Sequence, residues 1–138
     1  MERRETGENI IREMMGDETA GRLLASAASG TFGSSVAQLA IDEAFGEIWA
    51  RPGLDRKARS LVTMAVMIAL RQPNEFAIHM RIALNNGLTL HEIEETIIQT
   101  LPYVGYPAVA TALTAAAAVI RERGLDADPN YAGPRGLL

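Results

Sequence analysis

Turns that contain glycine and proline divide the chain into segments of helical length, and no segment of useful length alternates apolar and polar residues as a half-buried strand does. Within the segments, apolar residues recur at the spacing of one helical face. The hydrophobic fraction of 48% includes only 5% aromatic residues, so it consists mostly of residues that helices accept well. The sequence therefore predicts an all-α fold of about six to seven helices.

Caps and helix-breaking residues set the expected helix boundaries. Asp55 is a good N-cap, Thr89 and Glu92 have the spacing of a capping box, and Gly87 stands where a left-handed residue closes a helix. We expect two short helices or one interrupted helix between Glu5 and Gly30, and further helices at about 35–49, 55–71, 74–86, 89–101 and 107–123. The helix at about 55–71 is apolar all round its middle, so we expect it to be the central one.

Length and charge narrow the class of protein. The 138 residues suffice for one domain, which we expect at 1–124, before an extended or disordered tail at 125–138. A net charge of −4, from 13 basic and 17 acidic residues, argues against a nucleic-acid partner. The longest apolar run, at 60–70, is too short to cross a bilayer, and the polar start does not resemble a signal peptide. We expect a soluble cytoplasmic protein without a membrane partner.

One histidine has surroundings that suit proton transfer. His79 lies in the middle of a predicted helix, one turn after Glu75, and shares its face with Ile82 and Asn86. A carboxylate beside an imidazole can fix its tautomer and raise its basicity. Spacing alone nevertheless favours a structural polar contact over an acid/base pair. His91, in the exposed first turn of a capped helix, is expected to be a surface residue.

Other catalytic chemistries find little support in the sequence. The absence of cysteine excludes disulfides, thiolate nucleophiles and thiolate metal sites. Two ligands at the spacing of Glu75 and His79 make a weak metal signal, so we expect no metal. No serine stands in a nucleophile elbow, and no glycine-rich loop matches a phosphate-binding pattern. Five arginines flank the central helices and could hold a carboxylate if they point inward, although a surface or structural ion pair is the simpler interpretation: Arg51, Arg56, Arg59, Arg71 and Arg81.

A set of ordered motifs resembles the carboxymuconolactone decarboxylase family. The motifs lie at 46–61, 75–89, 92–95, 99 and 103–108, and residues 75–87 read E-F-x-x-H-x-R-x-A-x-N-N-G. The resemblance covers roughly residues 36 to 122. It implies an AhpD-like helical bundle that forms a homo-oligomer, commonly a trimer or hexamer.

The motifs also separate two branches of that superfamily. The AhpD-like peroxidase branch carries a C-x-x-C pair before the helix histidine, where this chain has Gln72 and Glu75. The sequence is therefore similar to the decarboxylase branch and not to the thiol peroxidases. It departs from typical gamma-carboxymuconolactone decarboxylases at Phe45, which replaces a tryptophan, and at Ala110 and Thr114, which replace an asparagine and a second histidine.

The resemblance implies a reaction and a set of site residues. The expected function is cofactor-independent decarboxylation of a small unsaturated carboxylate or lactone, in the catabolism of aromatic compounds. His79 would be the acid/base and Glu75 its orienter or proton partner, while Arg51, Arg81 and Tyr103 would bind the substrate.

Two other functions stay open. Related proteins isomerise or tautomerise unsaturated acids with the same proton-transfer groups. Alternatively, the chain is a helical assembly protein without catalysis, in which the alanine-rich segment at 107–123 packs between subunits and His79 is a buried structural residue.

Overall fold

The computed structural model describes residues 2–127, and this range contains helices and turns but no strand. The predicted all-α class is confirmed. The described helices are α1 (Arg3–Met15), α2 (Asp17–Ala28), α3 (Ser34–Leu39), the π-helical segment η1 (Ala40–Ile48), α4 (Arg56–Ala69), α5 (Pro73–Asn85), α6 (Leu90–Val104), α7 (Tyr106–Glu122) and the 3-10 helix η2 (Leu125–Ala127).

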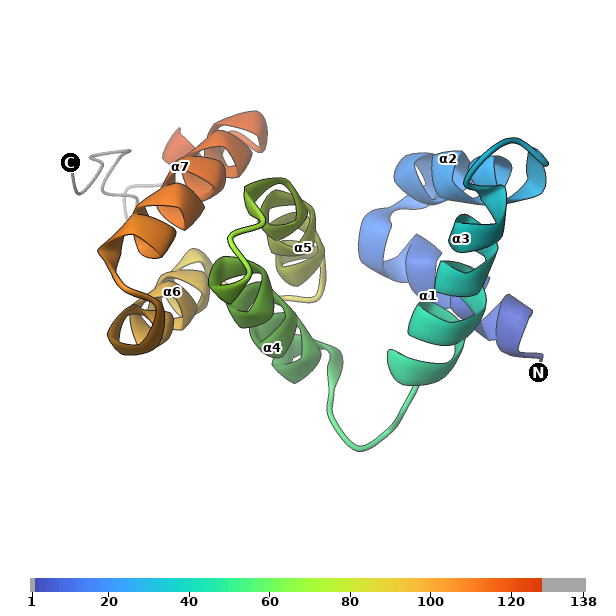
Figure 1. Cartoon of the computed structure of the whole chain (residues 1–138), viewed down its shortest axis with the longest axis horizontal. Coiled ribbons are helices and arrows are strands. Elements are labelled where there is room, and N and C mark those ends of the chain that lie inside the picture. The colour runs from blue at the N-terminus through green and yellow to red at the C-terminus, as the bar shows by residue number, and fades with distance from the viewer. Residues whose placement is uncertain (1, 128–138) are drawn as a thin grey trace. The chain divides into compact units, whose positions relative to one another are not determined.

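The chain divides into two compact units, Met1–Arg59 and Ser60–Leu138 (Figure 1). The predicted division into a domain at 1–124 and a tail at 125–138 stays a prediction. Leu125–Ala127 form a 3-10 helix at the start of the tail that was expected to be extended or disordered. The remaining residues of the predicted tail lie outside the described range.

In the first unit, α1 packs closely against η1. The two backbones meet at two glycines: a Cβ on Gly7 would overlap the carbonyl oxygen of Ile41, and a Cβ on Gly46 would overlap that of Arg3. Arg4 adds a two-point ion pair with Asp42 across the same crossing, with its Nη2 donating to Oδ2 over 2.7 Å. Glycine at both crossing points therefore allows α1 to approach η1 to backbone contact.

The segment expected as one helix at about 35–49 is divided between α3 and η1. In η1 the coil is wider than an α-helix, and the N–H of Trp49 donates to the carbonyl of Ala44, five residues earlier. The apolar spacing of the sequence did not predict this change. The break expected between Glu5 and Gly30 falls at Gly16, so two helices form.

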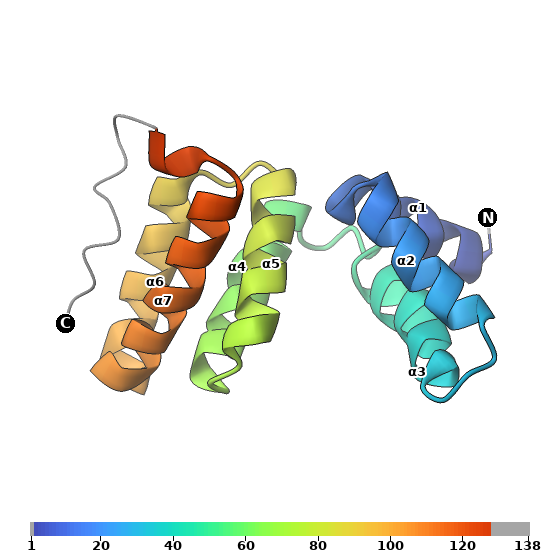
Figure 2. The same cartoon turned by 90° about the horizontal axis from the view of Figure 1, so that it is seen from above.

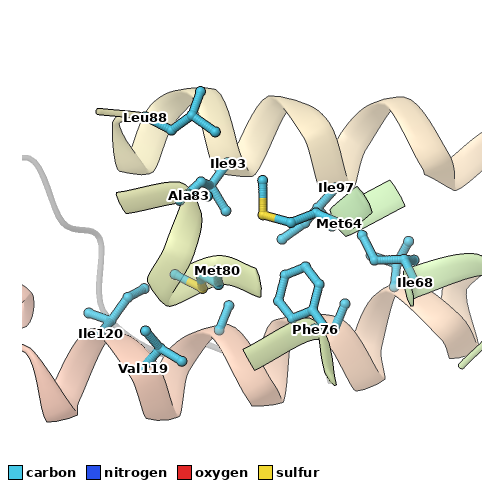
Figure 3. Packing of buried hydrophobic residues seen from close by; sticks show 13 residues of the cluster. Met64, Ile68, Phe76, Met80, Ala83, Leu88, Ile93, Ile97, Val119 and Ile120 are labelled. Atoms are coloured by element: carbon cyan, nitrogen blue, oxygen red, sulfur yellow. The ribbon is translucent and has the colours of Figure 1, made fainter. Parts of the chain in front are cut away.

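The second unit buries one apolar core between four helices. Figure 2 shows α7 beside α5 and α6, which are its packing partners. Side chains from all four helices point into the same interior (Figure 3), among them Met64, Ile68, Phe76, Met80, Ala83, Ile93, Ile97, Val119 and Ile120. Burial of this surface is the main stabilising contribution to the unit.

Helix α4 is not buried all round, contrary to the expectation from its composition. Its positions 60, 64 and 68 are buried, whereas Val62 and Val66 are 57% and 44% exposed, and Leu70, directly after the helix, is 60% exposed. The composition of a helix does not show how many of its faces find a neighbour. Among residues 2–127, the core covers only one face of α4.

The predicted caps of α4 and α6 are present. Asp55 accepts a hydrogen bond from the N–H of Ala58, and Thr89 and Glu92 form the reciprocal capping box. Gly87 ends α5 with φ at 95°, a conformation that favours glycine. Helix α6 continues to Val104, past the expected end near 101, and includes Pro102.

No helix among residues 2–127 has both the length and the apolar character needed to cross a membrane.

Candidate functional site

Helix α5 carries the polar groups of the family motif on one face. Pro73 at its first turn suits a helix start, because that position needs no N–H donor. Glu75, His79, Ile82 and Asn86 then follow at spacings of three and four residues. Glu75 is exposed, His79 and Asn86 are half-buried, and Ile82 is buried. The face therefore passes from solvent into the protein along the helix.

His79 lies in an environment that favours its neutral form. Its Nδ1 is buried and has no hydrogen-bond partner among the described residues. Its Nε2 is not both buried and unpaired. Burial lowers the pKa of His79 below its ordinary value, and the nearby charge of Glu75 opposes that shift only in part. At neutral pH the ring is therefore uncharged and can act as a proton donor or acceptor.

Glu75 acts on His79 through its charge. The two residues lie one turn apart, but the structure shows no hydrogen bond between the Glu75 carboxylate and Nδ1 of His79. In this conformation Glu75 influences His79 by its charge and not through a hydrogen bond to Nδ1.

A buried serine on α4 completes the polar end of the face. Nδ2 of Asn86 donates to Oγ of Ser60 over 3.0 Å, and Ser60 has no exposed surface. The sequence analysis placed Asn86 on the face of His79 but did not single out Ser60. The available signal was its spacing: Ser60 stands one turn before Met64 and two turns before Ile68, on the face that α4 buries.

Arg81 is held by another helix. Its Nε donates to Oε2 of Glu122 on α7 over 2.7 Å, and its Nη2 donates to Oε1 over 3.2 Å. This hydrogen bond is the main cause that lowers the pKa of Glu122 below its ordinary value. Arg123 reinforces the junction through hydrogen bonds to Oδ1 of Asn85 and the carbonyl of Arg81. The geometry makes Arg81 a link between α5 and α7.

The other two predicted substrate-binding residues are exposed. Arg51 belongs to the first unit, in the turn before α4. Tyr103 belongs to the second unit, near the end of α6, and is 80% exposed. Of the four predicted site residues in the second unit, the structure places Glu75 and His79 together on one face of α5.

A small hollow lies in the second unit near the start of α5. Its volume is about 10 Å³, roughly the space of one water molecule. Its walls come from the end of α4, the following turn, the first turn of α5 and two turns of α7: Met67, Ile68, Arg71, Gln72, Pro73, Phe76, Ala108, Thr111 and Ala112. Within residues 2–127, no group of three or more His, Asp or Glu side chains is arranged to hold a metal ion.

Two of the three departures from the family pattern, Ala110 and Thr114, lie on α7. The hydroxyl of Thr114, at the position of the second histidine, donates to the carbonyl of Ala110 over 3.1 Å. Ala110 stands where the asparagine was expected, so each of the two altered positions is part of a local helical contact.

A family model of the carboxymuconolactone decarboxylases matches residues 35–118, more than half of the chain. The chain belongs to the carboxymuconolactone decarboxylase family. The resemblance of the sequence motifs is thereby confirmed, and His79, Asn86 and Ser60 all lie within the matched region.

Curated relatives support the same family assignment. A 4-carboxymuconolactone decarboxylase of Acinetobacter baylyi is 44% identical over 82 residues, which are 59% of this chain and 61% of that protein. A nitrosuccinic acid decarboxylase of Metarhizium robertsii is 35% identical over 107 residues, which are 78% of this chain and 73% of that protein. The chain thus matches less than two thirds of the length of the first relative.

Proposed function

We propose that this carboxymuconolactone decarboxylase family member is a decarboxylase of a small unsaturated carboxylate or lactone, with His79 as its acid/base. One observation carries the proposal: the histidine of the family motif is half-buried, has a lowered pKa and keeps an unpartnered Nδ1. A neutral, partly desolvated imidazole suits proton transfer near neutral pH. Both named relatives are decarboxylases, which supports the reaction class.

The substrate supplies the electron sink in this reaction. When an unsaturated lactone loses a carboxylate as carbon dioxide, the bonding electrons move through the ring double bond to the lactone carbonyl. A proton then adds to carbon and the carbonyl re-forms. The protein needs to stabilise the developing oxyanion, deliver one proton and exclude water from the leaving carboxylate, so no cofactor is required.

His79 can supply the proton in this scheme. No acceptor reaches Nδ1, so we place the ring proton on Nε2 in the resting enzyme. Nε2 then donates toward the substrate, and solvent replaces the proton that each turnover consumes. Glu75 favours the protonated ring through its charge and eases this exchange.

The substrate-binding roles of Arg51, Arg81 and Tyr103 stay predictions. Arg81 could bind a substrate carboxylate only by releasing Glu122. The cytoplasmic location and the place in aromatic catabolism also stay predictions from the family resemblance.

We also propose that the protein assembles as a homo-oligomer, as a trimer or hexamer. The exposed side chains of Val62 and Val66 on α4, and of Leu70 directly after it, support this, since assembly would remove them from water. Light scattering after size-exclusion chromatography tests the mass, and a monomer would contradict the proposal.

The test of function is incubation with gamma-carboxymuconolactone, with carbon dioxide release and loss of the lactone chromophore followed together. Equal rates of both are expected of a decarboxylase. A chromophore change without carbon dioxide would instead indicate an isomerase, and no change at all would contradict activity on this lactone. This assay is informative because Ala110 and Thr114 replace the asparagine and the second histidine of typical gamma-carboxymuconolactone decarboxylases.

A further inference from the structure

Two neighbouring asparagines at the end of α5 are hydrogen-bonded to different helices. Nδ2 of Asn86 donates to Oγ of Ser60 on α4 over 3.0 Å. Oδ1 of Asn85 accepts from Nη1 of Arg123, directly after α7, over 2.9 Å. The N–H of Asn86 donates to the carbonyl of Ile82, four residues earlier, so the backbone is still helical at this point.

Asn86 is the asparagine that shares the side of His79. Seven residues separate the two, which places them within about 20° of each other around the helix and roughly 10 Å apart along its axis. Asn85 lies about 120° away from His79 around the same helix. Of the two hydrogen bonds, the one to Ser60 therefore holds the side of α5 that carries the imidazole.

The side of α5 toward α4 depends strongly on this bond. Among residues 2–127, the backbone of α5 comes close to α7 at more positions than to α4. Toward α4, Ser60 has no exposed surface and Asn86 is half-buried, so breaking their bond would leave polar groups unpaired away from water. The bond between Asn86 and Ser60 thus opposes rotation of α5 against α4.

The ring of His79 has no hydrogen bond at Nδ1 that could fix its orientation. Nδ1 is buried without a partner among the described residues, and Glu75 acts through its charge. The side chains around the ring must then orient it, and their arrangement depends on how α5 is rotated against its neighbours. Proton transfer requires Nε2 within hydrogen-bond reach of the substrate, so a small rotation of α5 would slow the reaction.

We propose that Asn86 and Ser60 are positioning residues for His79, because their hydrogen bond sets the rotation of α5 that aims Nε2 at the substrate. The inference rests on the proposed decarboxylase function and adds to it two residues that act through the helix. A positioning role affects the chemical step more than the binding step. Loss of the bond should therefore lower kcat and leave KM nearly unchanged.

The matched variants are Asn86→Ala and Asn85→Ala, which truncate the same side chain at adjacent positions and each remove an interhelical hydrogen bond. They are assayed as full-length proteins on gamma-carboxymuconolactone, at a temperature at which circular dichroism shows both to be folded. Asn86→Ala should lower kcat about 10-fold, with KM within about twofold of the parent value. Asn85→Ala should keep the parent kcat, and an equal loss of kcat in both variants would overturn the positioning role.

Ser60→Ala tests whether the two residues act through one bond. It should reproduce the loss of kcat seen in Asn86→Ala, and the double variant should be no slower than either single variant. Multiplied losses of kcat in the double variant would show that the residues act separately, and would overturn the proposal.

The pKa of His79 provides a readout that does not depend on turnover. Freeing α5 should expose the ring, so an NMR titration should show the pKa of His79 rising toward its ordinary value in Asn86→Ala but not in Asn85→Ala. An unchanged kcat or an unchanged pKa in Asn86→Ala would overturn the positioning role, while carbon dioxide release by the parent would leave the proposed function standing. If the pKa rises but the parent does not decarboxylate the lactone, the positioning of His79 is supported and the proposed activity on that lactone fails.

Discussion

Asn86, at the end of α5, donates a hydrogen bond to the completely buried Ser60 of α4 over 3.0 Å. Asn86 shares its helical face with His79, two turns away, so this bond sets how α5 lies against α4 on the side of the candidate acid/base. Buried polar pairs of this kind specify one packing arrangement, because an alternative register would leave both groups unsatisfied.

Ser60→Ala should destabilise the protein by about 1–2 kcal/mol, since the Asn86 amide then loses its partner in a half-buried position. Urea unfolding measures the change. In a double-mutant cycle with Asn86→Ala, the two substitutions should be non-additive by about 1 kcal/mol. Additive effects would show that the hydrogen bond contributes little.

The crossing of α1 and η1 predicts opposite effects for two glycine substitutions. Gly7→Ala should cost about 3 kcal/mol, because its Cβ would overlap the carbonyl oxygen of Ile41, which is backbone and cannot move aside. Gly21→Ala is the matched control: this helical glycine has open space around it and should gain about 0.5–1 kcal/mol. Thermal unfolding of the two variants measures both, and equal melting temperatures would contradict the close crossing.

The charge of Glu75 is expected to hold up the pKa of His79. Burial lowers that pKa and Glu75 opposes the effect, so Glu75→Gln should lower the pKa of His79 further. An NMR titration of the His79 ring proton measures the change. An unchanged titration would show that the carboxylate does not act on the ring.

The lowered pKa of His79 makes the free energy of unfolding depend on pH. The folded-state pKa of His79 lies below its unfolded value of about 6.5, so in that interval the unfolded chain binds more protons. This contribution to stability is complete above pH 6.5 and is lost as the pH falls toward the folded-state pKa. His79→Gln should therefore lose less stability than the parent between pH 7.5 and 5, and identical pH profiles would contradict the assignment.

The junction of Arg81 with Glu122 should be structural and salt-sensitive. Arg81→Gln should return the pKa of Glu122 toward its ordinary value and lower the melting temperature slightly, with the difference decreasing at high salt. Its KM should change little, because the guanidinium is already engaged by Glu122. A large rise in KM would show instead that Arg81 contacts the substrate, as the family resemblance implied.

Local signals predicted much of the fold. The capping box at Thr89, the cap at Asp55 and the left-handed Gly87 depend on a few neighbouring residues, so they could be read from the sequence. The π-helical form of η1 could not, because it accompanies a backbone contact with α1, far away in the sequence. The exposed face of α4 was not predicted for a similar reason: the composition of a helix does not show how many neighbouring helices pack against it.

The candidate site was predictable only where its residues share one helix. Glu75 and His79 follow from their spacing on α5. Ser60 as the partner of Asn86, and Glu122 as the partner of Arg81, come from other helices and required the tertiary structure. The positive φ of Arg71, in the turn between α4 and α5, was not predicted either, because glycine is the residue that normally signals such a position.

The most direct test of the account is the rate of carbon dioxide release from gamma-carboxymuconolactone by His79→Gln, relative to the parent protein. The two should first be matched in oligomeric mass and melting temperature. If His79 transfers the proton, the rate should fall at least about 100-fold. Release of carbon dioxide at the parent rate would contradict the role of His79 as the acid/base.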